Sequence, residues 1–189
     1  MAEILVSDNF DNIENWKTDI PKGRPEEQRI SFQDGKAISI NNGCFMILNK
    51  DIEGEVFLEI GVSAEQIDQE GYQNHEHWDF NIKWMHNLNI ILLFDKNGYD
   101  RIGYVESPLG IMDVNKIIFN EMSSTTKNGK IQLSIFEKGF QAKYLDSVGN
   151  EISISNSDID NPYSKFLLLG LAAFSNSPRM VDNLKITRL

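Results

Sequence analysis

The chain has 189 residues, 41% of them hydrophobic and 10% aromatic, which is a globular composition and enough for one core without disulfides. Its formal net charge is −10 and its 18 Lys and Arg residues are scattered singly, which argues against nucleic acid as a partner. No stretch reaches the roughly 18 consecutive apolar residues of a membrane-spanning helix, so membrane insertion is not expected either.

Strand-like segments recur about every 8 to 15 residues, separated by Gly, Asn and Asp turns. Two hairpins are predicted, because Asp34-Gly35 and residues 95–98 lie between strand-like runs and accept the positive φ of tight turns. Further strands are expected at residues 45–48, 56–62, 78–85, 116–121, 131–136, 140–145, 152–155, 166–174 and 180–187. About a dozen strands and no amphipathic helix predict one all-β domain over residues 1–189, an antiparallel two-sheet β-sandwich of the jelly-roll type.

The run from Lys165 to Phe174 is apolar on both faces of a strand, which is typical of a central strand covered on both sides. A membrane-binding or partner-binding strip is the alternative, although one such strand is normal in the middle of a sandwich. The first strand-like residues, near Ser7 to Asp11, and the last, Arg179 to Ile186, are expected to be edge strands that lie side by side.

Cys44 is the only cysteine, so the chain can form no intrachain disulfide. It lies in the apolar run of residues 44–48, and no spacing in the sequence links it to a histidine that could activate it. We therefore interpret it as a small buried hydrophobic residue and not as a nucleophile. Residues 1–4 lack the basic start and long apolar stretch of a secretory signal. The protein is therefore expected in the cytoplasm, or in the periplasm or outside the cell if a signal has been removed.

The densest group of chemically versatile side chains lies in residues 74–86, which contain all three histidines and two of the three tryptophans. A strand here would place Trp78, Phe80, Ile82 and Trp84 on one face and His77, Asp79, Asn81 and Lys83 on the other. The first face is expected in the core. The second forms a polar row on the surface of a sheet.

On a curved sheet, such a row can line a concave face, where sugar hydroxyls need paired donors and acceptors and an aromatic ring for stacking. The candidate substrate-binding set is His77, Trp78, Asp79, Asn81, Lys83 and Tyr104. Within it, the polar side chains would bind hydroxyls, and Trp78 and Tyr104 would be stacking platforms near the rim. The alternative is a solvated face with the tryptophans in the core, since alternation alone indicates only a half-buried strand.

A metal site is a second interpretation of this segment. His75 and His77 have the spacing of a ligand pair on a strand, and Glu76, Asp79 or His86 would have to complete the site. Isolated pairs of this kind are usually not ligands.

Acid–base catalysis is a third interpretation, with His77, Asp79 and Lys83 as the candidate catalytic residues and Tyr104 or Lys83 as the partner of His77. A polysaccharide lyase would need such a group. Nothing in the sequence selects these residues over their neighbours.

Three motifs, in order along the chain, resemble the concanavalin A-like lectin and glucanase superfamily, the jelly rolls that include laminin-G-like domains. They are Asp8-Asn9-Phe10-Asp11 followed by Trp16, the hairpin from Phe32 to Ile38, and the closing run Val181 to Ile186. Together they span the whole chain. The resemblance implies a sandwich that recognises or cleaves sugars.

The resemblance also implies a structural Ca²⁺ between the first and last strands, since many members of the superfamily hold one there. The ligands would be Asp182, the backbone carbonyl of Gly35, and Asp8 or Asn9. Calcium takes 6 to 8 oxygen ligands, and backbone carbonyls can supply several of them. The alternative is that Asp182 ends a β-bulge or caps a turn without a metal.

The glucanases of this superfamily use a Glu-x-Asp-x-x-Glu pattern on one strand, and the chain contains no such triplet. The nearest dense acids, Glu65, Asp68 and Glu70, are expected in a loop and have the wrong spacing for one strand face. The resemblance therefore favours a carbohydrate-binding module that is not catalytic, with a poly- or oligosaccharide as partner.

Two alternatives remain open. The first is a carbohydrate-active enzyme, either a polysaccharide lyase or a glycoside hydrolase with a different mechanism. The second is a protein-interaction sandwich that presents loops at residues 66–76 and 107–113.

Overall fold

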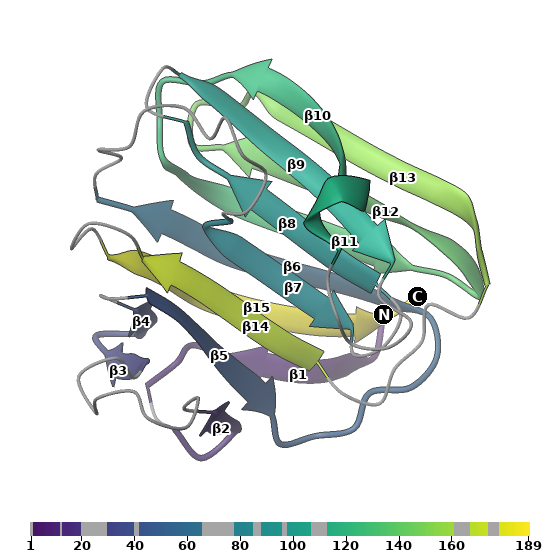
Figure 1. Cartoon of the computed structure of the whole chain (residues 1–189). Helices are drawn as coiled ribbons and strands as arrows, with labels where there is room; N and C mark the ends of the chain where they lie inside the picture. Colours follow the sequence, from purple (N-terminus) through teal and green to yellow (C-terminus); the bar gives the residue numbers. More distant parts are fainter. Residues whose placement is uncertain are drawn as a thin grey trace.

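The protein is a two-layer β-sandwich (Figure 1). The computed structural model describes residues 2–11, 13–19, 30–39, 42–65, 78–84, 88–95, 98–106, 113–160, 167–173 and 178–189. Fifteen strands lie in these ranges, in two antiparallel sheets of eight and seven strands. This confirms the all-β sandwich. No helix in the described ranges is long and apolar enough to cross a membrane.

The eight-stranded sheet has the order β13-β12-β11-β6-β15-β4-β3, and β1 pairs with β15 along the same edge as β4. Its strands are β1 (Ile4–Asp8), β3 (Ser31–Gln33), β4 (Lys36–Ser39), β6 (Val56–Ala64), β11 (Asn128–Ile135), β12 (Lys138–Asp146), β13 (Glu151–Asp160) and β15 (Arg179–Arg188).

The seven-stranded sheet has the order β10-β9-β8-β7-β14-β5-β2. Its strands are β2 (Trp16–Asp19), β5 (Asn42–Leu48), β7 (Phe80–Trp84), β8 (Leu88–Leu93), β9 (Tyr99–Glu106), β10 (Ile118–Ser123) and β14 (Leu167–Ala173). A 3₁₀ turn, η2 (Val114–Lys116), precedes β10 and includes Lys116, the first residue of the strand expected at 116–121.

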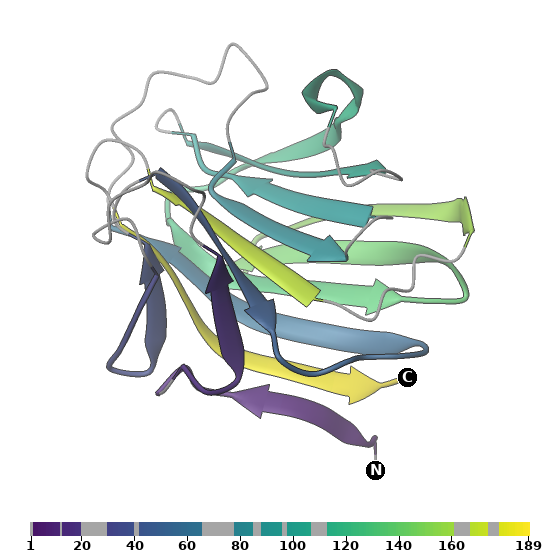
Figure 2. The ribbon, with the colours of Figure 1, turned by 60° about the horizontal axis from the view of Figure 1, so that its bottom comes forward.

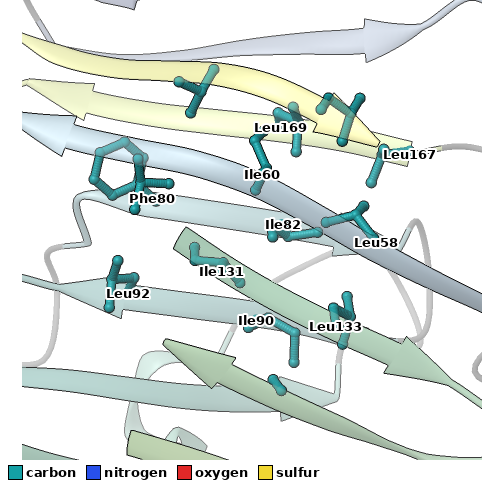
Figure 3. Packing of buried hydrophobic residues seen from close by; sticks show 14 of the residues in the cluster. Leu58, Ile60, Phe80, Ile82, Ile90, Leu92, Ile131, Leu133, Leu167 and Leu169 are labelled. Carbon is teal, nitrogen blue, oxygen red and sulfur yellow. The ribbon is translucent and has the colours of Figure 1, made fainter. Parts of the chain in front are cut away.

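The core fills the space between the sheets (Figure 3). Leu58 and Ile60 of β6 and Ile131 of β11 come from one sheet and face Phe80, Ile82, Ile90, Leu92 and Leu169 of the other. From Val56 to Ser63, strand β6 alternates between buried and half-buried residues, as a strand with one covered face should. Each fully buried aliphatic or aromatic side chain contributes about 1.5–3 kcal/mol to folding, so this layer dominates the stability.

Strand β14 is central, as the doubly apolar run at residues 165–174 predicted, because it pairs with β7 on one side and β5 on the other. Leu167, Leu169 and Leu171 are buried in the core. Gly170 faces the other way, where aromatic side chains lie against it.

The two predicted hairpins are confirmed. Gln33 of β3 pairs with Lys36 of β4, and the two residues between them, Asp34 and Gly35, have φ of 51° and 73°. Two consecutive positive φ values define the type I′ turn, which matches the twist of adjacent strands. Strands β8 and β9 form the second hairpin.

The two ends of the chain meet as expected: Asp8 pairs with Leu184, and Ile4 with Thr187. Figure 2 shows β1 and β15 side by side, with both termini at one end of the sandwich. The expectation that β15 is an edge strand is wrong, because it lies between β6 and the pair β1 and β4.

Candidate functional site

The polar row of β7 lies on the outer face of the seven-stranded sheet, meaning the face turned away from the eight-stranded sheet. Phe80, Ile82 and Trp84 are buried in the core, and Asn81 and Lys83 alternate with them. Asn81 pairs with Gly170 of β14 and with Ile91 of β8. The predicted alternation therefore holds over residues 80–84.

The alternation reverses just before β7, so Trp78 lies on the outer face instead of in the core. Its indole packs 5.4 Å from the ring of Phe45, between ring centroids. A Cβ added at Gly170 would lie only 2.7 Å from Cη2 of Trp78. Glycine at position 170 therefore lets the partly exposed indole rest directly on the sheet, next to Asn81.

Asp79 was expected in the polar row on the outer face, but its side chain is buried between the sheets. The Nε–H of Arg179 donates a 2.6 Å hydrogen bond to its Oδ1, and the backbone N–H of Phe94 donates a 2.7 Å bond to its Oδ2. Both partners are almost inaccessible, with 0% of Asp79 and 2% of Arg179 exposed. Burial raises the pKa of Asp79, and the positive charge of Arg179 opposes that shift. This ion pair joins β15 of one sheet to the entry of β7 in the other.

A second ion pair, with a buried carboxylate and a half-buried lysine, lies between β9 and the turn before β11. The ammonium of Lys127 donates to the carboxylate of Asp100, whose side chain is fully buried. The same ammonium lies 5.4 Å from the ring centroid of Phe94. Burial raises the pKa of Asp100, and the hydrogen bond from Lys127 opposes that shift. Both pairs serve the fold.

Tyr104 also lies on the core side, which removes it from the candidate stacking positions beside Asn81 and Lys83. Its ring makes an edge contact with Phe140 at 4.9 Å between centroids, and 8% of the residue is exposed. Its hydroxyl oxygen accepts a 2.9 Å hydrogen bond from Nδ2 of Asn156. Tyr104 therefore supports the opposite sheet.

The centre of the outer face is apolar and covered. Ile91 and Leu93 of β8 and Val105 of β9 form a second buried cluster, against which Trp78, Ile117 and Phe119 pack. The sequence signal for this cluster was available, since residues 88–94 are apolar at nearly every position. A strand of that kind needs cover on both faces.

Two polar side chains of the face lie partly under this cover. Asn81 is 3% exposed, and within the described part of the chain its Oδ1 accepts no hydrogen bond. Lys83 is half-buried, and burial lowers the pKa of its ammonium. A buried carbonyl oxygen without a donor is costly, so a water or a ligand hydroxyl is expected to approach Asn81.

His77 and the predicted metal pair His75 and His77, with Glu76 and His86, lie outside the described residues. The metal and acid–base interpretations that depend on them stay predictions. Within the described ranges, no group of three or more His, Cys, Asp or Glu side chains could hold a metal ion.

The residues of the implied calcium site are brought together only in part. A Cβ added at Gly35 would lie 3.4 Å from the carbonyl oxygen of Asn9 and 3.9 Å from Oδ1 of Asp11. The carboxylate of Asp8 already accepts hydrogen bonds from the backbone N–H of Phe10 and the side chains of Asn15 and Trp16. It is therefore committed to the fold.

Asp182 does not complete this group. Its carboxylate lies against Gly61 of β6, whereas Gly35 leads into β4, on the other edge of β15. The register of β15 shifts after Asp182 and Asn183 has φ of 48°, so Asp182 does stand at a β-bulge.

No family model matches the chain, and no curated protein matches its sequence. Solved structures do share its architecture. The exoplasmic/lumenal domain of VIP36, bound to Ca²⁺ and Man3GlcNAc, superposes with a TM-score of 0.70 at 6% identity over 94% of this chain and 85% of that one. The CBM2 module of the evolved Dit of Lactobacillus casei BL23 phage J-1 gives 0.66 at 9% identity, over 100% and 97%.

A lectin from Bauhinia forficata in complex with GalNAc gives a TM-score of 0.60 at 9% identity, over 96% of this chain and 97% of that one. The chain has the fold of these lectin-like sandwiches. At such low identity the likeness concerns the fold, and the chemistry of the site has to be argued from the residues of this chain.

Proposed function

We propose that this sandwich is a carbohydrate-binding module of the concanavalin A-like type, with its site on the outer face of the seven-stranded sheet at Trp78, Asn81 and Lys83. The observation that carries the proposal is the partly exposed indole of Trp78, which lies on Gly170, the residue that pairs with Asn81 across β14 and β7. The lectin-like fold supports it, since this fold is shared with the VIP36 domain bound to Man3GlcNAc and with the Bauhinia forficata lectin bound to GalNAc.

A pyranose ring suits this arrangement because it has both apolar C–H faces and hydroxyl groups. An aromatic platform is worth about 0.5–1.5 kcal/mol beyond the area it buries. A hydroxyl could accept from the half-buried ammonium of Lys83, and a hydroxyl or water that gains access to the buried Oδ1 of Asn81 could donate to it. Hydrogen bonds to charged groups add about 1.5–3 kcal/mol each.

The test is a glycan array, followed by calorimetry of Trp78→Ala, Asn81→Leu and a control variant, Tyr99→Ala. Tyr99 is an exposed aromatic residue that does not contribute to the outer-face cluster. We expect Trp78→Ala to weaken binding about tenfold or more. Asn81→Leu should weaken binding without loss of thermal stability, because it removes an unsatisfied buried oxygen. Unchanged affinity in Trp78→Ala would refute the site.

We also propose that the module binds without turnover. Asp79 and Tyr104, two of the candidate acid–base residues, are directed into the interior, which supports binding over catalysis. The test is product release from a polysaccharide panel. Turnover by the parent protein that disappears in His77→Ala would establish an enzyme instead.

A structural Ca²⁺ is proposed at the junction of β1 and β4, around Asn9, Asp11 and Gly35. The proximity of the Asn9 carbonyl and the Asp11 carboxylate to Gly35 supports this group. With one carboxylate the affinity should be weak, in the roughly 10⁻⁴–10⁻³ M range of extracellular modules. Calcium should raise the melting temperature of the parent and not of Asp11→Asn. Equal melting curves in calcium and in EDTA would count against the ion.

A further inference from the structure

A hollow of about 460 Å³ opens on the eight-stranded sheet, whereas Trp78 packs on the seven-stranded sheet. Phe136 at the β11–β12 turn, Gln141 of β12, and Ser155, Asn156 and Asp158 of β13 line it. This volume lies within the roughly 300–1,000 Å³ range of small-molecule sites.

A β-bulge shapes the hollow. Lys138 pairs with Asp160 and Phe140 with Asn156, so one residue of β12, Gly139, stands opposite three residues of β13. Gly139 has φ of 78°, and a Cβ there would lie 2.0 Å from the carbonyl oxygen of Asn156. Only glycine fits at this position. Bulges of this kind redirect side chains and locally interrupt a ladder.

The wall of the hollow is held in place by contacts with the core. Nδ2 of Asn156 donates to the hydroxyl oxygen of Tyr104 at 2.9 Å, and its Oδ1 accepts from the backbone N–H of Asp158 at 2.7 Å. The ring of Tyr104 is fixed in turn against Phe140. Both ends of the Asn156 amide are therefore engaged, which lowers the entropy cost of binding at this wall.

Side chains with the chemistry of a sugar site project from this frame. Phe136 is 37% exposed and belongs to neither buried cluster. Gln141 and Ser155 are exposed and directly opposite each other across the β12–β13 ladder, and Asp158 is exposed at the bulge. One aromatic ring beside an amide, a hydroxyl and a carboxylate offers stacking together with both hydrogen-bond donors and acceptors.

We propose that this hollow is a second carbohydrate-binding position, in which a pyranose ring stacks on Phe136 and its hydroxyls bond to Gln141, Ser155 and Asp158. The choice of ligand class rests on the proposed function, whereas the position does not. Because this site and Trp78 are on different sheets, one molecule could hold two sugar chains at once.

The experiment is an NMR titration of the ¹⁵N-labelled full chain with mannobiose, cellotriose and chitotriose. The parent is compared with Phe136→Ala, Gln141→Ala, Trp78→Ala and the control Tyr99→Ala. Amide shifts at residues 136–141 and 155–158 report this hollow, and shifts at 78–83 report the other face. We expect Phe136→Ala to weaken the first response about 5- to 10-fold and Tyr99→Ala to leave it unchanged.

The outcomes separate the two proposals. Shifts confined to 78–83 would overturn the second position and leave the proposed function standing. Shifts at the hollow that survive Trp78→Ala would support the second position. If the parent shows no shifts at residues 78–83, the proposed site at Trp78 would be refuted. No shift with any of the three sugars would overturn both. Thermal melts check that each variant is folded, and Gln141→Ala tests the same site without touching the aromatic ring.

Discussion

The buried pair between Asp79 and Arg179 allows a sharp test of how the two sheets are held together. Replacing Arg179 by Met keeps an unbranched side chain of similar length in the interior but removes its charge. The carboxylate of Asp79 then stays buried and keeps the hydrogen bond from the backbone N–H of Phe94, but it loses its cationic partner. The perturbation therefore isolates the cost of an uncompensated charge.

The magnitude follows from the geometry. At an effective dielectric constant of about 20, unit charges 2.6 Å apart attract by about 6 kcal/mol, an upper bound because the charges are delocalised. Removing one partner of such a buried pair costs about 3–5 kcal/mol. In a domain of this size each kcal/mol lowers the melting temperature by about 2–4 °C, so Arg179→Met should melt about 10 °C lower.

The deficit should also depend on pH. Burial raises the pKa of Asp79 and Arg179 opposes this, so the loss of Arg179 raises that pKa further. A carboxyl group whose pKa is higher in the folded state takes up a proton on folding, and its contribution to stability falls as pH rises through the window between the two pKa values. The loss in Arg179→Met should therefore be smaller at about pH 5 than at about pH 8.

The assay is urea unfolding of the parent and Arg179→Met at both pH values, followed by fluorescence. The matched control is Arg101→Met, which breaks a partly exposed pair with Glu121 at 3.2 Å and should cost less than about 1 kcal/mol. A deficit as small as that of the control, or a deficit that grows towards acid pH, would refute the reasoning.

Three further predictions concern the interior. Lys127→Met should destabilise the protein by about 3 kcal/mol in urea unfolding, because it leaves the carboxylate of Asp100 buried; a loss below 1 kcal/mol would contradict this. Tyr144→Phe should be neutral or stabilising by about 1 kcal/mol in the same assay, since the buried hydroxyl of Tyr144 has no hydrogen-bond partner among the described residues. Gly170→Ala should cost about 1–3 kcal/mol and change the near-ultraviolet dichroism of Trp78, whose ring must move; an unchanged spectrum would be evidence against the close contact.

The fold was predictable where the deciding information is local. Asp34 and Gly35 favour a tight hairpin turn by their own backbone preferences. The run at residues 165–174 is apolar on both faces of a strand, which predicts a central strand without knowledge of its partners. The pairing of the chain ends was predicted from the strand-like segments near Ser7 to Asp11 and Arg179 to Ile186, and β1 and β15 confirm it.

The candidate site was less predictable because distant residues decide it. The predicted alternation of a strand included Trp78 and Asp79, but β7 begins at Phe80. Asp79 lies in the interior because it pairs with Arg179, 100 positions away in the sequence. Nothing in the sequence around Tyr104 indicates which face of the sheet its side chain occupies. The hollow beside Phe136 depends on a bulge in β13, which pairing reveals and periodicity does not.

The pairing of β1 with β15 places the first and last described strands side by side. The backbone N–H of Arg188 donates to the carbonyl of Glu3 at 2.9 Å. A short covalent bridge between the termini would remove roughly 5 kcal/mol of chain entropy from the unfolded state. New ends could then be opened in the exposed turn at residues 147–149, which makes the sandwich suited to circular permutation or to insertion within another protein.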